Sequence, residues 1–351
     1  MSEGDNIFKI IYIVIAIFVF GLLIFIHELG HFLAARACGV GVKEFAIGMG
    51  PKLVSWKSKK YDTVFRLRLF PIGGFVSMVG EEEESECDNA FCNKSIFKRI
   101  FIVLAGPVMN IILGFLLMII LVIGQKTLLS TTIYQFDDNA LSSQYLQVED
   151  KIVKVGKTRV YTFYDVVNEI MNQGYEPVDI TVIRSGERIT LEDVTFPVIV
   201  QQGVEFGQYD FVPYLDRETP INYVKHAITR SLGTVKMVVD SIVDLVNGRY
   251  GLQALSGPVG VTEVIVDAAQ NGFYTLLYIV IVLSINLGVF NLIPFPILDG
   301  GRLLFLAIEG VRGKPINKDA ENYINTVAMI IMLGFMVFII FKDVFGILGG
   351  S

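Results

Sequence analysis

Charged residues are scarce in this chain of 351 residues: they make up 18% of it, against 53% hydrophobic residues. Together with a mean hydropathy of +0.57, this scarcity excludes an ordinary soluble protein and indicates a membrane protein with some soluble mass. Basic residues are not in excess, since 29 lysines and arginines face 35 acidic residues. We therefore expect no nucleic-acid partner. Internal repeats and low-complexity linkers are absent as well.

Cysteine is also scarce, with only Cys38, Cys87 and Cys92 present. All three fall in one loop that the charge pattern described below assigns to the cytosol. An odd number of cysteines there indicates reduced thiols rather than a disulfide framework. Cys87 and Cys92 could bind a metal ion, but no histidine lies near them in the sequence to complete such a site.

Four apolar segments are long enough to cross a membrane, and they predict a polytopic α-helical membrane protein. They are 10–26 (apolar as far as 35), 100–125, a stretch within 268–298, and 324–341. The first is not expected to be a cleavable signal peptide, because it lacks a basic region before it and a small-residue cleavage site after it.

Lysine and arginine near the ends of these segments predict their orientation. The connections 36–99 and 301–323 hold most of these basic residues, whereas the two ends of the chain offer only Lys9 and Lys342. Both basic connections therefore belong in the cytosol, and the long segment 126–267 belongs outside. In this topology the first and third spans run in the same direction, from outside to inside.

The cytosolic connection contains a predicted β-hairpin at 62–79. Apolar and arginine side chains alternate with a period of two at Phe65, Arg66, Leu67, Arg68 and Leu69. Pro71 and Gly73 separate this strand from a second, 75–79. The hairpin is either a small sheet on the membrane surface or an edge strand that accepts an extended peptide. The acidic run 81–86 is interpreted as a solvated loop.

The extracytoplasmic segment is predicted to form a small α/β domain over about 127–200. Strands at 131–136 and 151–160, a helix ending before Gly174 and a hairpin turning at Ser185-Gly186 have the order of a PDZ domain, a peptide-end-binding module. Val148-Glu149 stands where a proline and a glycine are usual in such domains.

A helix follows, which begins at Thr219-Pro220 and ends near Asn247-Gly248. Its apolar residues recur in steps of three and four, so it is amphipathic and is expected on the outer membrane face or against the bundle. His226 falls on its polar side and is interpreted as a surface residue.

The motif HELGH, His27 to His31, closes the first span and carries the chemistry. Positions i and i+4 share one face of a helix, so both imidazoles can bind one ion, and zinc suits them. Glu28 would then take a proton from the zinc-bound water and pass it to the leaving amine. Ionisable residues at this depth cost free energy and are usually kept only where function needs them. A helix end that is merely capped by polar residues is therefore the weaker interpretation.

A catalytic zinc needs a third protein ligand, and ionisable candidates at this depth are few. Asp299 ends the third span, which runs parallel to the first, so both ends reach the same depth. Asn291, Pro294 and Pro296 precede it in NLIPFPILDGG. A substrate helix must unwind to be cut, and lipid satisfies no freed backbone groups. We therefore expect Asn291, with the segment broken at Pro294, to engage the substrate.

Together HExxH, FAIGMGPKL, PIGGFV, LAGPVMN, LSGPVGV and NLIPFPILDGG resemble the bacterial site-2 proteases of the RseP/RasP type, with a single PDZ-like domain. The resemblance implies zinc ligation by His27, His31 and Asp299, one zinc ion per chain, and Glu28 as the catalytic acid and base. It assigns Asn110 to substrate binding and supports strand pairing by the 62–79 loop.

The implied function is an intramembrane zinc metalloprotease that makes the second cut in single-span membrane proteins, such as anti-sigma factors already trimmed by a site-1 protease, or in signal-peptide remnants. The implied location is a bacterial plasma membrane, with the PDZ-like domain outside and the active site toward the cytosol. The expected domains are 1–126 (including the loop 43–79), 127–200, 201–260 with the helix 220–247, and 261–351. A peptide-sensing scaffold and a zinc transporter are the competing hypotheses.

Overall fold

The computed structural model describes residues 3–59, 62–81, 86–201, 204–249 and 256–349. The chain divides into two compact units, Met1–Gly114 with Ser256–Ser351, and Phe115–Leu255. The division falls inside a helix, α2, so one continuous helix contributes to both units. Most of the acidic run predicted as a solvated loop lies outside the described residues.

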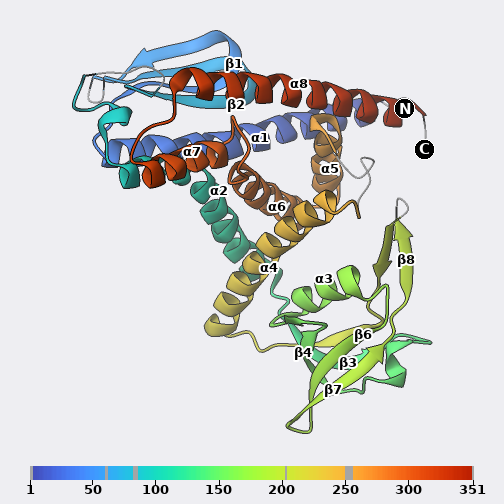
Figure 1. The fold of residues 1–351 in the computed structure, drawn as a ribbon. Helices are drawn as coiled ribbons and strands as arrows, with labels where there is room; N and C mark the ends of the chain where they lie inside the picture. The colour runs from blue at the N-terminus through green and yellow to red at the C-terminus, as the bar shows by residue number, and fades with distance from the viewer. Residues whose placement is uncertain (1–2, 60–61, 82–85, 202–203, 250–255, 350–351) are drawn as a thin grey trace. The chain divides into compact units, whose positions relative to one another are not determined.

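The first unit is mainly helical (Figure 1). Its helices are α1 (Glu3–Ala37), α2 (Ile96–Gln125), α5 (Pro258–Gln270), α6 (Phe273–Asn291), α7 (Asp299–Arg312) and α8 (Lys318–Gly349), with a short 3-10 turn at Phe91–Asn93. Four of the described helices are long and apolar enough to cross a membrane: Ile11–Ala37, Ile96–Gln125, Phe273–Asn291 and Lys318–Asp343. The four predicted apolar segments are thereby confirmed as helices of membrane-spanning length.

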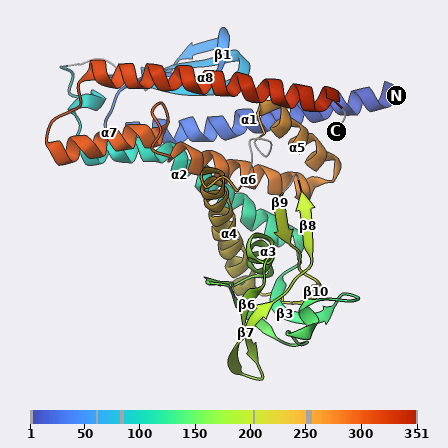
Figure 2. The same cartoon turned by 45° about the vertical axis from the view of Figure 1, so that its right-hand side comes forward.

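The third span, predicted within 268–298, is helix α6, and the predicted run also includes the last residues of the preceding helix, α5. Helix α5 ends at Gln270 and α6 begins at Phe273, because Gly272 adopts a φ of +105° that a helix does not allow. Helix α5 lies beside the N-terminal part of α1, and α7 lies beside its C-terminal part (Figure 1, Figure 2). The C-terminal part of α1 and the chain after α6 therefore meet in one region.

Glycines let the apolar helices approach closely. A Cβ on Gly30 of α1 would lie 2.3 Å from the carbonyl oxygen of Ala105, and one on Gly288 of α6 would lie 2.7 Å from that of Pro107. Helices in lipid gain little from hydrophobic association, so small residues at their contacts are the usual means of close packing. Helix α2 is thus packed against α1 and α6 at backbone distance.

The β-hairpin of the first unit has a different pairing from the predicted one. Strands β1 (Val42–Lys57) and β2 (Val64–Met78) are each continuous but bend, β1 at Gly48 and Gly50 and β2 near Gly73. Both halves of β2 pair with 44–47, one on each side: Ile47 is opposite Leu67 and also opposite Gly74. The two predicted strands therefore do not form a hairpin with each other, since 42–47 lies between them.

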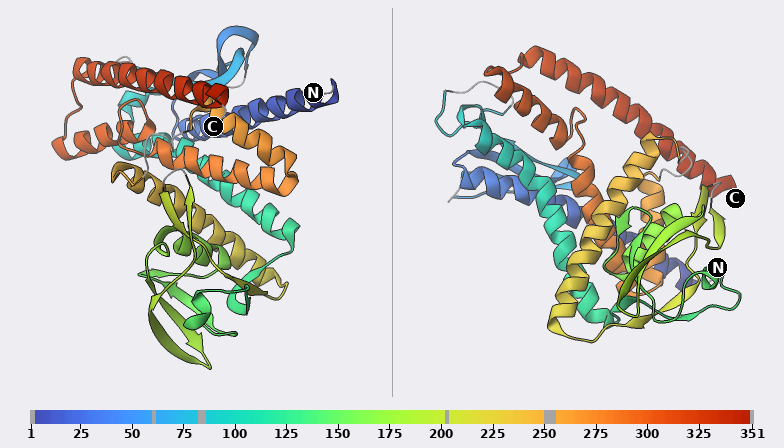
Figure 3. Two further views of the ribbon diagram at one scale, coloured as in Figure 1. Left: turned by 90° about the vertical axis from the view of Figure 1, so that its right-hand side faces the viewer. Right: turned by 60° about the horizontal axis from the view of Figure 1, so that its bottom comes forward.

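The second unit contains one antiparallel sheet with the strand order β10-β3-β4-β6-β7. Its elements are β3 (Leu129–Phe136), β4 (Lys151–Val155), β5 (Thr158–Arg159), α3 (Phe163–Gln173), β6 (Val178–Arg184), β7 (Glu187–Val194) and β10 (Phe211–Leu215), with a 3-10 turn at Ser142–Gln144. The hairpin of β8 (Val198–Gln201) and β9 (Val204–Gly207) projects from it (Figure 1, Figure 3). Strands β3, β4, β6, β7 and helix α3 match the predicted elements, and β8, β9 and β10 were not predicted.

Helix α4 (Pro220–Val246) begins at Thr219, whose side chain accepts from the backbone N–H of Asn222. It lies beside α3 in the second unit (Figure 2). The prediction that His226 is a surface residue is wrong: it is buried, and its Nε2 lies 2.9 Å from Asp216 Oδ2. The polar side of α4 packs inward, while its apolar residues such as Ile221, 79% exposed, stay uncovered.

Candidate metal centre and active site

Helix α1 carries both histidines of the HELGH motif on one face, near its C-terminal end. Both are buried, each 9% exposed, and their Nε2 atoms lie 3.3 Å apart. The i, i+4 spacing explains this arrangement, because the two residues are one helical turn apart. The helix thus presents two ring nitrogens at one point.

Asp299, the first residue of α7, supplies a third donor atom at the same point. Its Oδ2 lies 3.1 Å from His27 Nε2 and 3.3 Å from His31 Nε2. The three residues are a group whose donor atoms could hold a metal ion. The sequence prediction named these three residues, and the structure brings them together from positions far apart in the chain.

The segment between α6 and α7 folds tightly and so places Asp299. A Cβ on Gly300 would lie 2.1 Å from the carbonyl oxygen of Ile293, and one on Gly301 would lie 2.3 Å from that of Phe295. Backbone atoms cannot yield as a side chain can, so the two glycines are required for this turn. Ile297 adopts a φ of +73°, which costs about 1–2 kcal/mol for a non-glycine residue.

The donor set fits zinc. Zinc takes imidazole nitrogen and carboxylate oxygen at about 2.0–2.1 Å in a tetrahedral arrangement, in which neighbouring ligand atoms are about 3.3 Å apart. The three donor atoms are separated by 3.1–3.3 Å. Asp299 Oδ2 is also buried and has no hydrogen-bond partner among the described residues, which suits an atom reserved for a cation.

The nitrogen of His31 that faces away from Asp299 is held by the backbone. His31 Nδ1 lies 2.9 Å from the carbonyl oxygen of Ile102 in α2. A carbonyl only accepts, so Nδ1 carries the proton, and Nε2 is unprotonated and can bind a metal ion through its lone pair. Gly106, one helical turn after Ile102, makes the approach possible, because a Cβ there would lie 2.2 Å from His31 Nε2.

Glu28 lies next to the donor group, on the side of the β-sheet. A Cβ on Gly74 of β2 would be only 3.0 Å from Glu28 Cγ and 3.1 Å from the carbonyl oxygen of Ala46. Its side chain is half-buried, and no described residue forms a hydrogen bond with its carboxylate. Glu28 is therefore a carboxylate beside the candidate metal site that protein groups leave available.

The residues predicted to bind substrate are placed differently from one another. Asn291 is the last residue of α6, half-buried, and its side-chain N–H donates to the carbonyl oxygen of Leu287 at 2.9 Å. Pro294 is exposed in the segment that follows. Asn110 is fully buried, with its Nδ2 3.4 Å from His27 Nδ1.

The predicted edge strand is not an edge. Phe65 pairs with Phe45 on one side and with Trp56 on the other. Arg66 and Leu67 likewise pair with both halves of β1, and Arg68 pairs with its second half. The hairpin was expected to fold on itself, whereas β1 bends and encloses 64–68. Among the described residues, the segment 74–78 pairs only with 42–47 and so keeps one edge open. Gly74, beside Glu28, belongs to this segment.

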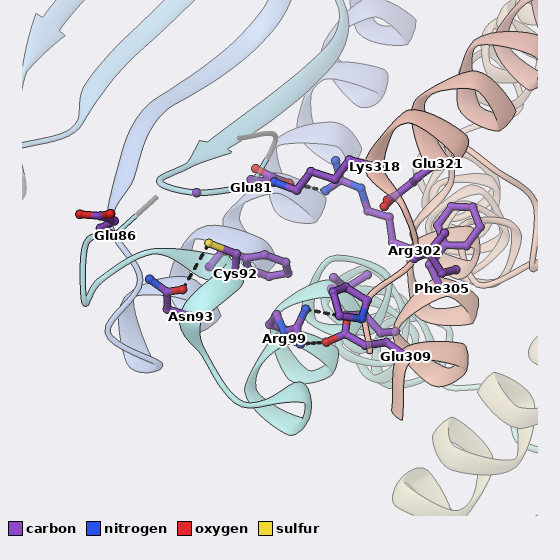
Figure 4. Close-up of a pocket in the computed structure, with 16 residues that line it drawn as sticks. Glu81, Glu86, Cys92, Asn93, Arg99, Arg302, Phe305, Glu309, Lys318 and Glu321 are labelled. Carbon is purple, nitrogen blue, oxygen red and sulfur yellow. Dashed lines mark hydrogen bonds and ion pairs between the residues drawn. The ribbon is translucent and has the colours of Figure 1, made fainter. Parts of the chain in front are cut away.

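A polar pocket of about 620 Å³ adjoins this region, lined by the loop after β2, the start of α2, and helices α7 and α8 (Figure 4). Two ion pairs cross it. Arg99 of α2 donates from both terminal nitrogens to Glu309 of α7, one at 3.0 Å, and Arg302 of α7 pairs with Glu81. Because Arg302 is about one turn after Asp299, these pairs hold α7, and with it the third potential metal ligand, against α2 and the loop after β2.

Gly106, Gly74 and the carbonyl of Ile102 are the site features that the sequence prediction did not single out. The glycines stand in LAGPVMN and PIGGFV, motifs that carried the family resemblance, but these two residues had no assigned role. Their function is to leave space, and the neighbour that needs the space is known only from the folded structure.

The chain belongs to peptidase family M50, the site-2 protease family, whose model matches residues 15–335. A protein of Clostridium acetobutylicum, whose name places it among zinc metalloproteases, is 35% identical over 334 residues, which cover 95% of this chain and 97% of the relative. The zinc metalloprotease RasP of Bacillus licheniformis is 28% identical over 415 residues, 93% of this chain and 97% of the relative. The regulator of sigma-W protease RasP of Bacillus subtilis is 28% identical over 412 residues, with the same coverage.

The protein is thus a zinc metalloprotease of the site-2 protease family, with zinc as its cofactor. Its four apolar helices and its family make it a multi-pass membrane protein. The expected enzyme class, the expected cofactor and the family resemblance are confirmed.

Proposed function

We propose that this protein hydrolyses peptide bonds within the transmembrane segments of single-span membrane proteins. The observation that carries the proposal is the convergence of His27, His31 and Asp299 within 3.1–3.3 Å, on and beside helices apolar enough to span a membrane. Buried ionisable residues in such a setting are expensive and are generally retained for function. A protease site at membrane depth meets its substrate there, and a transmembrane helix is the substrate that reaches it.

In this proposal His27, His31 and Asp299 hold the zinc ion. When bound, zinc supplies Lewis acidity, which makes water a stronger acid and polarises a peptide carbonyl. Glu28 takes the proton of the attacking water and delivers it to the amine nitrogen that leaves. Its half-buried carboxylate, without a hydrogen-bond partner among the described residues, is free to exchange that proton.

The open edge at 74–78 is proposed to receive the unwound substrate. Cutting a helix in lipid frees backbone N–H and C=O groups that lipid cannot satisfy, and a strand edge offers the complementary groups. Gly74 at this edge contacts Glu28, so a peptide paired there would pass the catalytic carboxylate. Asn291 and the exposed segment at Pro294, which precede Asp299 in the chain, would also contact the substrate.

The topology proposed for the membrane follows the distribution of basic residues: the 36–99 and 301–323 connections in the cytosol of a bacterium, and 126–267 outside. The domains proposed are those expected from the sequence, 1–126, 127–200, 201–260 and 261–351, and β10 from the third segment adds an outer strand to the sheet of the second. The sheet and helix α3 of the second unit would be a PDZ-like domain that rejects untrimmed substrates sterically. The uncovered apolar side of α4 suits the outer membrane surface.

The substrates proposed are membrane proteins already trimmed outside by another protease, such as anti-sigma factors, or signal-peptide remnants. The relative from Bacillus subtilis is named a regulator of sigma-W. Its similarity along nearly the whole chain supports, for this protein, the same class of substrate.

The test is to replace Glu28 with glutamine and to measure zinc content and cleavage of a single-span reporter in detergent. We expect zinc content to remain and cleavage to fall about 100- to 10,000-fold, the range for loss of a general acid and base. Glu263→Gln, the same change at an exposed glutamate of α5, is the matched control and should cleave normally. Wild-type cleavage by the Glu28 variant would refute the proposed role.

A further inference from the structure

Asn110 occupies a position that its sequence motif does not explain. It is 0% exposed, in the middle of α2, and its side-chain amide faces His27 Nδ1, the ring nitrogen on the side away from Asp299. The amide oxygen, Oδ1, is buried and has no hydrogen-bond partner among the described residues. Asn110 differs in this respect from Asn291, which is only half-buried and lies beside the segment proposed to contact the substrate.

The two histidines need the same tautomer if both are to give Nε2 to one ion. His31 is fixed in it by the carbonyl oxygen of Ile102, an acceptor that cannot change its role. His27 has no carbonyl at its Nδ1 and has the amide of Asn110 instead, at 3.4 Å. An amide has a donor end and an acceptor end of nearly equal size, so either can occupy this place.

We propose that Asn110 is a positioning residue for the metal site: its Oδ1, turned toward His27, accepts the hydrogen of Nδ1 and keeps Nε2 unprotonated as a zinc ligand. The proposal rests on the zinc site described above. With Nδ2 toward His27 instead, the amide would donate to Nδ1, and the ring proton would have to sit on Nε2, where zinc would bind. The turned amide gives the buried Oδ1 a partner and places Nδ2 where Oδ1 was.

The backbone at Asn110 is held so that only the side chain can turn. The hydroxyl of Ser284 in α6 donates to the carbonyl oxygen of Asn110 at 2.7 Å. One residue further along α2, Ile111 lies against Gly288, where a Cβ would be 2.8 Å from its side chain. Helix α2 is therefore fixed against α6 at this point, and the amide is presented to His27 from a rigid support, as a ligand-orienting partner requires.

The experiment measures zinc affinity of the full chain in detergent by competition with a chelator, for the wild type, Asn110→Leu and Asn110→Asp. Loss of a partner that orients a zinc-bound histidine weakens metal binding about 10- to 100-fold, and we expect this for Asn110→Leu. Asn110→Asp keeps an acceptor and should restore affinity to within about threefold of wild type. Asn322→Leu, the same type of change at an exposed asparagine of α8, is the matched control and should bind zinc normally.

A second measurement needs no variant at position 110. The chain has only three histidines, so 15N-labelled histidine gives a readable NMR spectrum, and His226→Gln identifies the signals outside the site. In the zinc-loaded protein, Nδ1 of His27 should carry a hydrogen. An unprotonated or zinc-bound Nδ1 would overturn the proposal even if the leucine variant failed to fold.

Different results would refute the role of Asn110 and the zinc site itself. Equal zinc affinity in wild type and Asn110→Leu would refute the role of Asn110 and leave the zinc site standing. Absence of zinc binding by the wild type, or unchanged binding after Asp299→Asn, would refute the ligand set itself.

Discussion

Replacing Gly106 with alanine should remove zinc from the protein while leaving most of the fold in place. The added Cβ would lie 2.2, 2.6 and 2.8 Å from three ring atoms of His31, the nearest being the proposed ligand atom Nε2, whereas ordinary contacts are 3.4–4 Å. The ring would have to move by about 1 Å, and zinc ligation tolerates about 0.2 Å. Its hydrogen bond to Ile102 opposes that movement.

Two opposing effects on stability accompany the change. Alanine is favoured over glycine inside a helix by about 1 kcal/mol, and overpacking a close contact costs about 1–3 kcal/mol. The net loss in free energy of unfolding is thus small, about 0–2 kcal/mol. Zinc affinity, in contrast, should fall about 100-fold or more, because one ligand is displaced.

The assay is zinc content after dialysis against a graded series of chelator concentrations, with thermal unfolding measured on the same samples. Gly334→Ala is the matched control, since nothing lies within 4 Å of a Cβ at that position of α8. Gly114→Ala, in the same helix as Gly106 but against the movable side chain of Ile285, separates helix packing from ligand displacement. Wild-type zinc retention by the Gly106 variant would show that His31 is not held as described.

Two further predictions concern stability, each with zinc retained. Glu149 adopts a φ of +72°, a conformation that costs a non-glycine residue about 1–2 kcal/mol, so Glu149→Gly should stabilise the second unit by about 0.5–1 kcal/mol in chemical unfolding; a loss of stability would contradict this. The carboxylate of Asp343 accepts from the backbone N–H groups of Gly257 at 2.9 Å and Gly260 at 3.1 Å. Asp343→Ala should therefore lower the melting temperature, at a cost of about 1–3 kcal/mol, and an unchanged melting temperature would show that the contact contributes nothing.

The membrane helices and the candidate ligands were predictable because each follows either from a short stretch of sequence or from the scarcity of alternative residues. Long apolar runs define the spans without knowledge of their neighbours. His27 and His31 are related by helical spacing alone, and Asp299 followed because few other ionisable residues share its depth. The structure brings the three together. A soluble protein with many surface carboxylates would not have allowed that argument.

The pairing of the β-hairpin was not predictable from periodicity. Alternation at Phe65–Leu69 correctly indicated a strand, but a period of two does not identify the partner strand or its register. The partner is set by bends at Gly48 and Gly50, which return β1 along both sides of the region. The edge segment beside Glu28 is therefore 74–78 rather than the predicted strand at 65–69.

The prediction that His226 lies at the surface was wrong for a related reason. An apolar stripe on α4 was identified, but the rule that apolar residues face the protein interior applies to water-soluble chains. In this chain the polar side packs within its unit, where Asp216 pairs with His226, and the apolar side is left uncovered. Sequence patterns give the two faces of a helix, and the surroundings decide which one the protein covers.

Every role assigned above depends on one zinc ion that is bound by His27, His31 and Asp299. Zinc-edge X-ray absorption of the purified full chain tests it most directly, because the method counts ligands and distinguishes nitrogen and oxygen from sulfur. We expect one zinc ion per chain, two imidazole ligands, and only nitrogen and oxygen ligands at about 2.0–2.1 Å. A sulfur shell at about 2.3 Å, which would place the metal on cysteines such as Cys87 and Cys92, or a single imidazole ligand, would contradict it.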